Sequence, residues 1–314
     1  MANRNETSVT SFILLGLVPV REQRIVLFVT FLIMYLITLL GNGAIIAVIR
    51  IDARLHTPMY FFLSVLSSVD ICIISVIVPS MLKNLISESK SISFSGCLTQ
   101  LYFFISLAGS ECFLLAAMAY DRYVAISSPL QYTIVMNPRL CYYLVAGSFA
   151  GGFLKSLLHT LMVLRLSFCG SNIINHFFCD LTALYKLSCT VTSLNELMIF
   201  IEGPFTLMAP FVIIVLSYCC IIIAILKISS TEGRHKAFST CFSHLTVVTL
   251  LYGSIIVMYV RPSSTYSPEK DRITALIYTA VTPMLNPFIY SLRNSDMKVA
   301  IRKAIVRKCI CHWM

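Results

Sequence analysis

Ionisable side chains inside apolar segments are the residues of this sequence that could do chemistry. Asp121 and Arg122 stand together at the end of one apolar run, and Asp70 and Glu111 are the only charged residues within two runs. A charge at bilayer depth is costly and usually faces a bundle interior or a functional site. With Asn286 in a third run, Asp70 and Glu111 either converge on one polar, cation-binding pocket or form a neutralised packing cluster. We expect a structural and switching role, because a pump or channel usually shows more ionisable groups.

Two further charged residues interrupt the apolar runs that contain them. Glu202 lies near one end of its run, where it faces either a ligand cavity or the lipid headgroups. Lys155 is unusual at its depth. Its long side chain either extends to the membrane surface or pairs inside the bundle.

The sequence lacks the residue combinations typical of an enzyme. It has no His-Glu-x-x-His zinc motif, no Gly-x-Ser-x-Gly nucleophile motif and no phosphate-binding glycine loop. His176, Cys179 and Asp180 have a spacing that suits a metal, but we expect Cys179 to form a disulfide instead. We therefore expect no catalytic residues and no metal site. A small-molecule transporter is the less favoured alternative, because no internal repeat is visible.

Composition indicates which elements position these residues. Of 314 residues, 58% are apolar and 12% charged, with a mean hydropathy of +0.84, whereas about 25% are charged in a soluble domain. A membrane helix needs about 20 mostly apolar residues, and seven runs qualify: residues 25–49, 58–82, 97–120, 140–164, 197–226, 238–260 and 273–292. Lipid offers backbone groups no partner, so these runs should be helices. We predict an all-α membrane protein with an extracellular N-terminus at 1–24, a seven-helix domain at 25–292 and a cytoplasmic helix and tail at 293–314.

One sequon indicates the orientation better than the charges do. Lys and Arg residues are divided almost equally between the two sides, so the positive-inside rule decides little. Asn5-Glu6-Thr7 is the only Asn-x-Ser/Thr sequon, and Asn5 can be glycosylated only in the lumen. We therefore expect a multi-pass plasma-membrane protein with its N-terminus outside. No cleavage site clearly follows the apolar stretch 11–20, so we expect the first span to direct insertion.

The net charge of +10 has two interpretations. Nucleic-acid binding is rejected, because the charges flank membrane spans. Contact with membrane lipid and a cytoplasmic partner fits. Residues 294–312 place Met297, Ile301, Ala304 and Ile305 on one helical face among basic residues, the pattern of a short amphipathic helix on the inner leaflet. Cys309 and Cys311 would carry palmitate there, the alternative being a frayed basic tail with two free thiols.

Four cysteines lie on the expected outer side. Cys97 is at the end of the third run, and Cys169, Cys179 and Cys189 lie in the long link between the fourth and fifth runs. Four cysteines in an oxidising compartment can pair in three ways. The sequence alone does not choose among them.

Six motifs occur in order along the seven runs. They are Gly41-Asn42, residues 55–64 (LHTPMYFFLS), residues 118–126 (MAYDRYVAI), Ser217-Tyr218, residues 236–241 (KAFSTC) followed by residues 243–245 (SHL), and residues 283–294 (PMLNPFIYSLRN). Any one could arise by chance, but the ordered set resembles the olfactory (odorant) receptors, a branch of the rhodopsin-like G-protein-coupled receptors. The resemblance covers roughly residues 5–294 and is closest to the large tetrapod-type class.

The resemblance implies roles for several residues. Cys97 would pair with Cys179, and Cys169 with Cys189. Asp121, Arg122 and Tyr123 would form the G-protein switch, with Arg122 held by Asp121 at rest and approached by Tyr218 and Tyr290 in the active state. Asp70, Glu111 and Asn286 would form a sodium-type pocket, and we expect no other cofactor.

The resemblance also places a ligand pocket in the outer half of the bundle. Its expected lining comprises Phe104, Ile105, Ala108, Gly109, Cys112, Glu202, Thr206, Tyr252, Tyr259 and Thr279. Residues 105, 108, 109 and 112 share one helical stripe. The alternative for this stripe is ordinary helix packing, which small residues such as Ala108 and Gly109 also suit.

The implied function is that of an odorant receptor. A small volatile ligand would bind in a mostly apolar cavity, and a stimulatory heterotrimeric G protein would raise cyclic AMP. Trafficking accessory proteins are further expected partners, and the cilia of olfactory neurons the expected location. A receptor of the same fold acting outside the olfactory epithelium is the serious alternative.

Overall fold

The computed structural model describes residues 9–17, 21–169, 171–259, 268–293 and 296–303. Seven of its helices are long and apolar enough to cross a membrane, as the sequence predicted. The glycosylation site predicted at Asn5 and the palmitoylation predicted at Cys309 and Cys311 lie outside the described residues.

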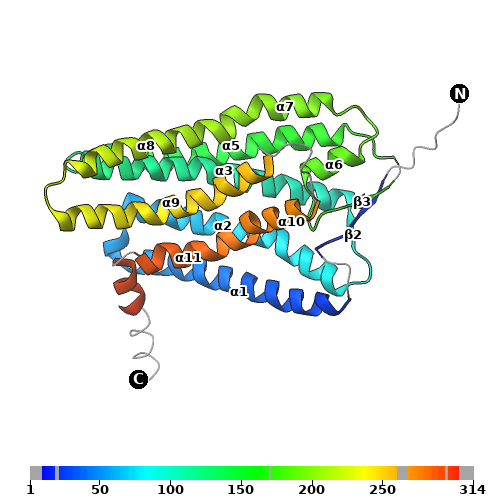
Figure 1. Ribbon diagram of the computed structural model, residues 1–314, viewed down its shortest axis with the longest axis horizontal. Coiled ribbons are helices and arrows are strands. Elements are labelled where there is room, and N and C mark those ends of the chain that lie inside the picture. Colours follow the sequence, from blue (N-terminus) through cyan, green and yellow to red (C-terminus); the bar gives the residue numbers. More distant parts are fainter. Residues whose placement is uncertain (1–8, 18–20, 170, 260–267, 294–295, 304–314) are drawn as a thin grey trace, which may run out of the picture.

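Helices account for all seven spans (Figure 1). The spans consist of α1 (Arg21–Ile51), α2 (Pro58–Ile86), α3 (Phe94–Ser127), α5 (Pro138–Leu164), α7 (Ser193–Gly203) with η2 (Pro204–Met208) and α8 (Ala209–Leu226), α9 (Thr231–Tyr259), and α10 (Pro268–Leu276) with η4 (Ile277–Val281) and α11 (Thr282–Arg293). Three short helices connect them: η1 (Ala53–Leu55), α4 (Tyr132–Val135) and α6 (Leu181–Leu187).

Local chemistry explains where several spans begin. Proline is tolerated in the first turn of a helix, where its missing N–H would have no partner, and Pro58 and Pro138 occupy that position in α2 and α5. Asn137 caps α5 by accepting a hydrogen bond from the Leu140 N–H at 3.0 Å. Ser93 caps α3 in the same way through the Gly96 N–H at 3.1 Å. Such caps satisfy backbone donors that a helix leaves free at its start.

Two spans contain a wide π-helical turn instead of a continuous α-helix. In the fifth span this turn is η2, and in the seventh it is η4. The sequence predicted both spans as uninterrupted apolar runs. Pro204 begins η2 and has no N–H to donate to the preceding turn. Turns of this kind are frequent at functional sites, and Glu202 and Thr206 flank or occupy this one.

The third span is the central helix of the bundle. Helix α3 packs against α2, α5, α8 and α9, and 72% of its most apolar window is buried, against 17% for α1. Its contact with α5 is close: a methyl group on Gly152 would meet the Ser106 carbonyl oxygen at 2.3 Å, and one on Gly109 would meet the Gly152 Cα at 3.3 Å. Small residues permit such close approach of helices in membranes.

A small sheet covers one end of the bundle (Figure 1). Strand β1 (Ser11–Leu14) pairs antiparallel with β2 (Ser91–Ser93) and parallel with β3 (Ile173–Ile174). The apolar stretch that is too short to span the membrane therefore begins as a strand, with Phe12 and Leu14 buried. We call this end of the bundle the sheet end.

The opposite end carries a short helix after the seventh span. Residues 296–303 are helical. Met297 and Ala300 are buried against the bundle, and Lys298, Arg302 and Lys303 are exposed. The described part of the predicted amphipathic helix therefore has one apolar and one basic face.

Candidate functional site

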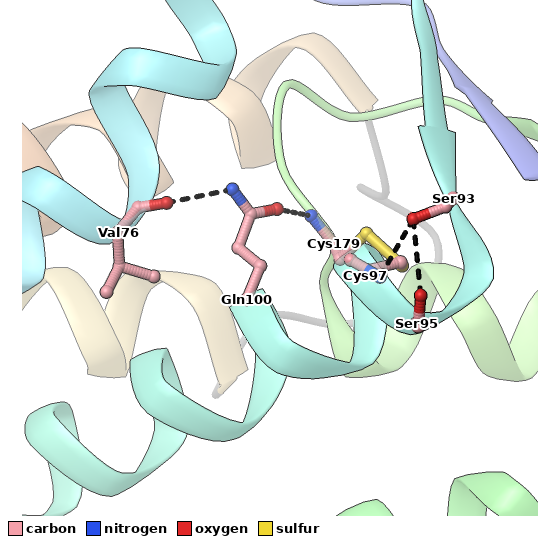
Figure 2. Close-up of a disulfide and its surroundings, with 7 residues drawn as sticks. Val76, Ser93, Ser95, Cys97, Gln100 and Cys179 are labelled. Carbon is pink, nitrogen blue, oxygen red and sulfur yellow. Dashed lines mark hydrogen bonds between the residues drawn. A yellow bond between two sulfur atoms is a disulfide. The ribbon is translucent and has the colours of Figure 1, made fainter.

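A disulfide and one glutamine fix the long loop over the sheet end. Cys97 on α3 is bonded to Cys179, as the resemblance implied. Figure 2 shows Gln100, one turn further along α3, with its side chain between α2 and the loop. Its amide donates to the Val76 carbonyl at 3.0 Å and accepts from the Cys179 N–H at 2.9 Å. The role of Gln100 was missed from the sequence, because its partners are distant backbone groups.

A second disulfide closes the remainder of this loop. Cys169 is bonded to Cys189, the other pairing implied by the resemblance. Asp180 begins α6 by accepting hydrogen bonds from the Thr182 N–H and hydroxyl. Because Cys179 is bonded to Cys97, its sulfur is not available as a thiolate ligand beside His176.

His176 lies buried among aromatic rings beneath the sheet. Its ring stacks on Phe177 at 4.7 Å and meets Phe178 edge-on at 4.5 Å. Burial lowers the pKa of the His176 imidazole below its ordinary value, and the charge of nearby Arg272 lowers it further, while Asp180 and Asp271 oppose the shift. The surroundings of His176 at the sheet end therefore disfavour its charged form.

Four polar side chains form a network between the fourth and fifth spans, near the sheet end. The Glu202 carboxylate lies 3.2 Å from the Lys155 ammonium and 2.9 Å from the His159 Nε2. Thr206 donates to the second Glu202 oxygen at 2.9 Å and accepts from Lys155 at 3.1 Å. Lys155 thus pairs inside the bundle and does not extend to the membrane surface, and Glu202 faces α5.

Aromatic and thiol groups form apolar surroundings for Phe104 and Cys112 of α3. Phe104 packs on Phe178 at 5.0 Å and on Tyr278 at 5.9 Å. Tyr252 lies beside Cys112 and contacts the Phe211 ring at 4.9 Å. Of the ligand residues expected on α3, Phe104 and Cys112 therefore face aromatic groups of the loop and of the fifth to seventh spans.

The other predicted ligand residues are placed differently. Ile105 and Ala108 are half-buried at the edge of the same apolar cluster as Phe104. Gly109 faces Gly152 of α5, so helix packing, the alternative considered for this stripe, accounts for it. Thr279 is fully buried and donates its hydroxyl to the Ala275 carbonyl of its own helix at 2.7 Å. The side chain of Tyr259 lies outside the described residues.

The polar residues at mid-bundle come together as the sequence suggested. Asn286 donates to Asp70 at 2.8 Å, and Glu111 lies close enough for its charge to act on Asp70. All three side chains are at most 2% exposed. One oxygen of each, Asp70 Oδ1, Glu111 Oε1 and Asn286 Oδ1, is buried with no hydrogen-bond partner among the described residues.

The Gly-Asn motif of the first span explains how the seventh reaches this cluster. Asn42 donates to the Pro283 carbonyl and to Thr38 of its own helix, both at 3.1 Å. A methyl group on Gly41 would meet the Pro287 ring at 3.0 Å. The missing side chain at Gly41 therefore lets α11 lie directly against α1, with Asn286 turned toward Asp70.

The acid and the arginine of the third span have separate contacts at the opposite end. Asp121 accepts a hydrogen bond from the Tyr132 hydroxyl of α4 at 2.8 Å. Arg122 is 4% exposed, and its guanidinium lies 3.9 Å from the Met59 sulfur. Tyr123, the third residue of the motif, is only half-buried. Tyr132 is a partner that sequence reasoning missed, because its link to Asp121 requires the loop to fold back.

A buried histidine joins three spans next to Arg122. The His244 Nε2 lies 3.1 Å from the Leu115 carbonyl of α3 and therefore donates to it, so Nδ1 accepts from the Tyr218 hydroxyl at 2.9 Å. The charge of Arg122 acts on both Tyr218 and His244. His244 belongs to the Ser-His-Leu motif of the sixth span, and these contacts give it a structural role.

Tyr290 of the seventh span also lies within reach of this group. The charge of Arg122 acts on Tyr290. The Tyr290 hydroxyl is buried without a hydrogen-bond partner in the described part of the chain. The resemblance implied that both tyrosines approach Arg122, but their hydroxyls differ. The Tyr218 hydroxyl is hydrogen-bonded to His244, whereas the Tyr290 hydroxyl has no such partner among the described residues.

Comparison with known proteins identifies the family to which this chain belongs. A family model described as "Olfactory receptor" matches residues 31–308. The mouse protein "Olfactory receptor 5AP2" is 55% identical over 96% of both chains, and the rat protein "Olfactory receptor 1f45" is 55% identical over 98% of both. The human protein "Olfactory receptor 5AP2" is 51% identical over 96% of both. The chain therefore belongs to the olfactory receptor family, whose members are multi-pass signalling receptors of the plasma membrane and not enzymes.

Proposed function

We propose that this odorant receptor binds a small volatile organic molecule near the sheet end and activates a stimulatory G protein, which raises cyclic AMP. The observation that carries the proposal is the buried group around Arg122. One hydrogen bond joins His244 of the sixth span to Leu115 of the third, and another joins Tyr218 of the fifth span to His244. Such contacts can exchange between two arrangements of the same helices, as a switch requires.

The ligand site lies between the Lys155–Glu202 network and the aromatic groups around Phe104 and Tyr252. The network belongs to the fourth and fifth spans, and the aromatic groups belong to α3, the long loop and the fifth to seventh spans. Apolar surroundings with a few polar anchors suit a small organic ligand. Glu202 and Thr206 flank or occupy the π-helical turn η2. A ligand that replaces one partner of this network would therefore change the turn directly.

Signalling then follows from differential binding. The ligand needs only to bind the active arrangement better than the resting one, and each tenfold preference contributes about 1.4 kcal/mol of bias. Movement of α8 and α9 away from α3 would separate Tyr218 and His244 from Leu115 and expose Arg122 to the G protein.

The surface at the Arg122 end suits a protein partner. Leu130 is 93% exposed and Ile134 is 73% exposed in the connection between the third and fourth spans. Lys227 and Arg234, at the connection between α8 and α9, are also exposed. Exposed apolar residues beside basic ones are typical of an interaction site.

We also propose that the Asp70, Glu111 and Asn286 cluster holds a sodium ion. Three buried oxygens without partners fit a hard cation, which prefers oxygen ligands. Bound there, the cation would neutralise charge between the second, third and seventh spans. Sodium-dependent thermal stabilisation should be lost in Asp70→Asn if this is correct. An equal sodium effect in that variant would favour protonated carboxyl groups instead.

The proposed orientation places the sheet end outside the cell. Two disulfides lie at this end, and disulfides persist in oxidising compartments. The N-terminus with Asn5 is then extracellular and the Arg122 end cytoplasmic. Cilia of olfactory neurons are the proposed location, with trafficking accessory proteins as partners in delivery.

The test is cyclic AMP in transfected cells exposed to a broad odorant panel, with surface staining and a stimulatory G protein co-expressed. Arg122→Ala should abolish a saturable response at equal surface level. Arg139→Ala, which removes an exposed arginine at the start of α5, should leave the response intact. A response that survives Arg122→Ala, or that Arg139→Ala abolishes equally, would contradict the assigned switch.

A further inference from the structure

A cleft of about 690 Å³ opens at the end of the bundle opposite the sheet, outside the ligand and switch sites. It lies between the last residues of α1, the turn η1, the start of α2, helix α4 and the start of α5. Its volume is within the range of about 300–1,000 Å³ typical of small-ligand sites. All these segments are ends of membrane spans or the connections between them.

The lining of the cleft includes both apolar and polar side chains. Phe61, Val65 and Tyr142 are apolar or aromatic, whereas Arg50, His56 and Thr57 are polar, and we call these three residues the polar rim. Tyr142 is 64% exposed on α5, so the cleft opens toward the lipid that surrounds the spans. An amphiphile could therefore enter from the membrane with its head group at the rim.

Arg50 is the positively charged residue of the rim, and its guanidinium is available to bind an anionic group. It is exposed, and the described residues provide it with no ion-pair partner. Arg54 lies four residues further on but is engaged, because its guanidinium bonds the Asp52 carboxylate. That hydrogen bond from Arg54 lowers the pKa of Asp52 to about 2. The free charge beside the cleft is therefore positive and comes from Arg50.

We propose that this cleft binds an anionic phospholipid of the cytoplasmic leaflet, with an acyl chain against Phe61 and Tyr142 and the head group at Arg50. Anionic lipids are concentrated in that leaflet and attract basic residues at the membrane surface. The leaflet rests on the proposed orientation, but the binding itself does not depend on signalling. The cleft adjoins the switch, because Tyr132 both lines it and holds Asp121.

The sequence offers a clean fluorescent reporter for this site. Trp313 is the only tryptophan in the chain, so Trp313→Phe with Tyr142→Trp places a single indole in the cleft wall. The full-length receptor would be reconstituted in phosphatidylcholine vesicles that contain a minor fraction of either brominated phosphatidylserine or brominated phosphatidylcholine. Brominated chains quench the indole only at contact.

Stronger quenching by phosphatidylserine at equal mole fraction is the expected result. Arg50→Gln should lower this preference about fivefold, which corresponds to about 1 kcal/mol for one cation near an anionic surface. Arg54→Gln is the matched control and should leave the preference unchanged. Ser68→Phe, at an exposed cleft residue, should reduce quenching by both lipids without entering the core.

Three results would overturn the proposal. Equal quenching by the two lipids would show ordinary contact with bulk lipid. An equal loss in Arg50→Gln and Arg54→Gln would show attraction to the surface as a whole. Displacement of brominated phosphatidylserine by cholesterol would assign the cleft to a sterol. Because none of these measurements involves an odorant or a G protein, they separate this site from the proposed function.

Discussion

The contact between the third and fourth spans gives the sharpest prediction, the substitution Gly152→Ala. The added methyl group would lie 2.3 Å from both the Ser106 carbonyl oxygen and the Ser110 hydroxyl, and 2.7 Å from the Ser110 backbone nitrogen. Two of these atoms are backbone, so α3 and α5 must move apart. Overpacking of this kind costs about 1–3 kcal/mol, and we expect the upper end because the two backbone atoms cannot rotate away as the Ser110 hydroxyl can. At roughly 2–4 °C per kcal/mol, the thermal midpoint of the purified receptor should fall by roughly 6–12 °C.

Gly147→Ala is the matched control on the same helix. A methyl group there meets nothing within 4 Å, and alanine is favoured over glycine in a helix by about 1 kcal/mol. Its midpoint should therefore stay level or rise. A Gly152→Ala midpoint equal to wild type, or a larger loss in Gly147→Ala, would refute the close packing of α3 on α5.

Three further predictions concern a glutamine, a histidine and an ion pair near the sheet end. Gln100→Leu should cost about 1–3 kcal/mol, because it leaves the buried partners of the amide unsatisfied, and the thermal midpoint should fall accordingly. The lowered pKa of His176 means that its contribution to stability is present above its ordinary pKa of 6.5 and is lost as pH falls below that value. The midpoint should therefore drop between pH 7.5 and pH 5, and His176→Phe should flatten this dependence. Lys155→Met and Glu202→Leu should each destabilise more than the double variant, since a single change leaves one charge unpaired. A double variant as unstable as the sum of both would contradict the ion pair.

The sequence predicted the fold well because the membrane imposes it. Seven apolar runs must form helices that satisfy their own backbone, and the described residues include seven helices long and apolar enough to cross a membrane. Asp70 and Asn286 could be expected to meet, because a polar group in lipid needs a partner on another helix. The interruption at η2 was not predicted, because Pro204 alone does not distinguish a π-helical turn from a kink.

The hydrogen-bond and ion-pair partners of polar residues within the bundle were harder to predict than the polar residues themselves. The sequence marks Lys155 and Glu202 as unusual charged residues within apolar spans. Whether each side chain faces lipid or the bundle interior depends on the rotation of its helix. The apolar pattern does not fix this rotation when a span is apolar on every side. The fourth span illustrates this, since only 33% of its most apolar window is buried. Tyr132 likewise could not be predicted as the partner of Asp121, because the short connections between spans have no periodic sequence pattern.

The distribution of contacts around the third span decides which helices can move. Helix α3 is locked to α5 through Gly152, where backbone meets backbone, and such a contact has no second arrangement at similar energy. Near Arg122, single hydrogen bonds through His244 instead join α9 to α3 and to Tyr218 of α8, each with a net contribution of only about 0.5–1.5 kcal/mol. A ligand preference of tenfold, about 1.4 kcal/mol, is therefore large enough to break one of them and too small to separate α3 from α5. The third and fourth spans should remain a fixed unit during activation, and the fifth and sixth should carry the motion.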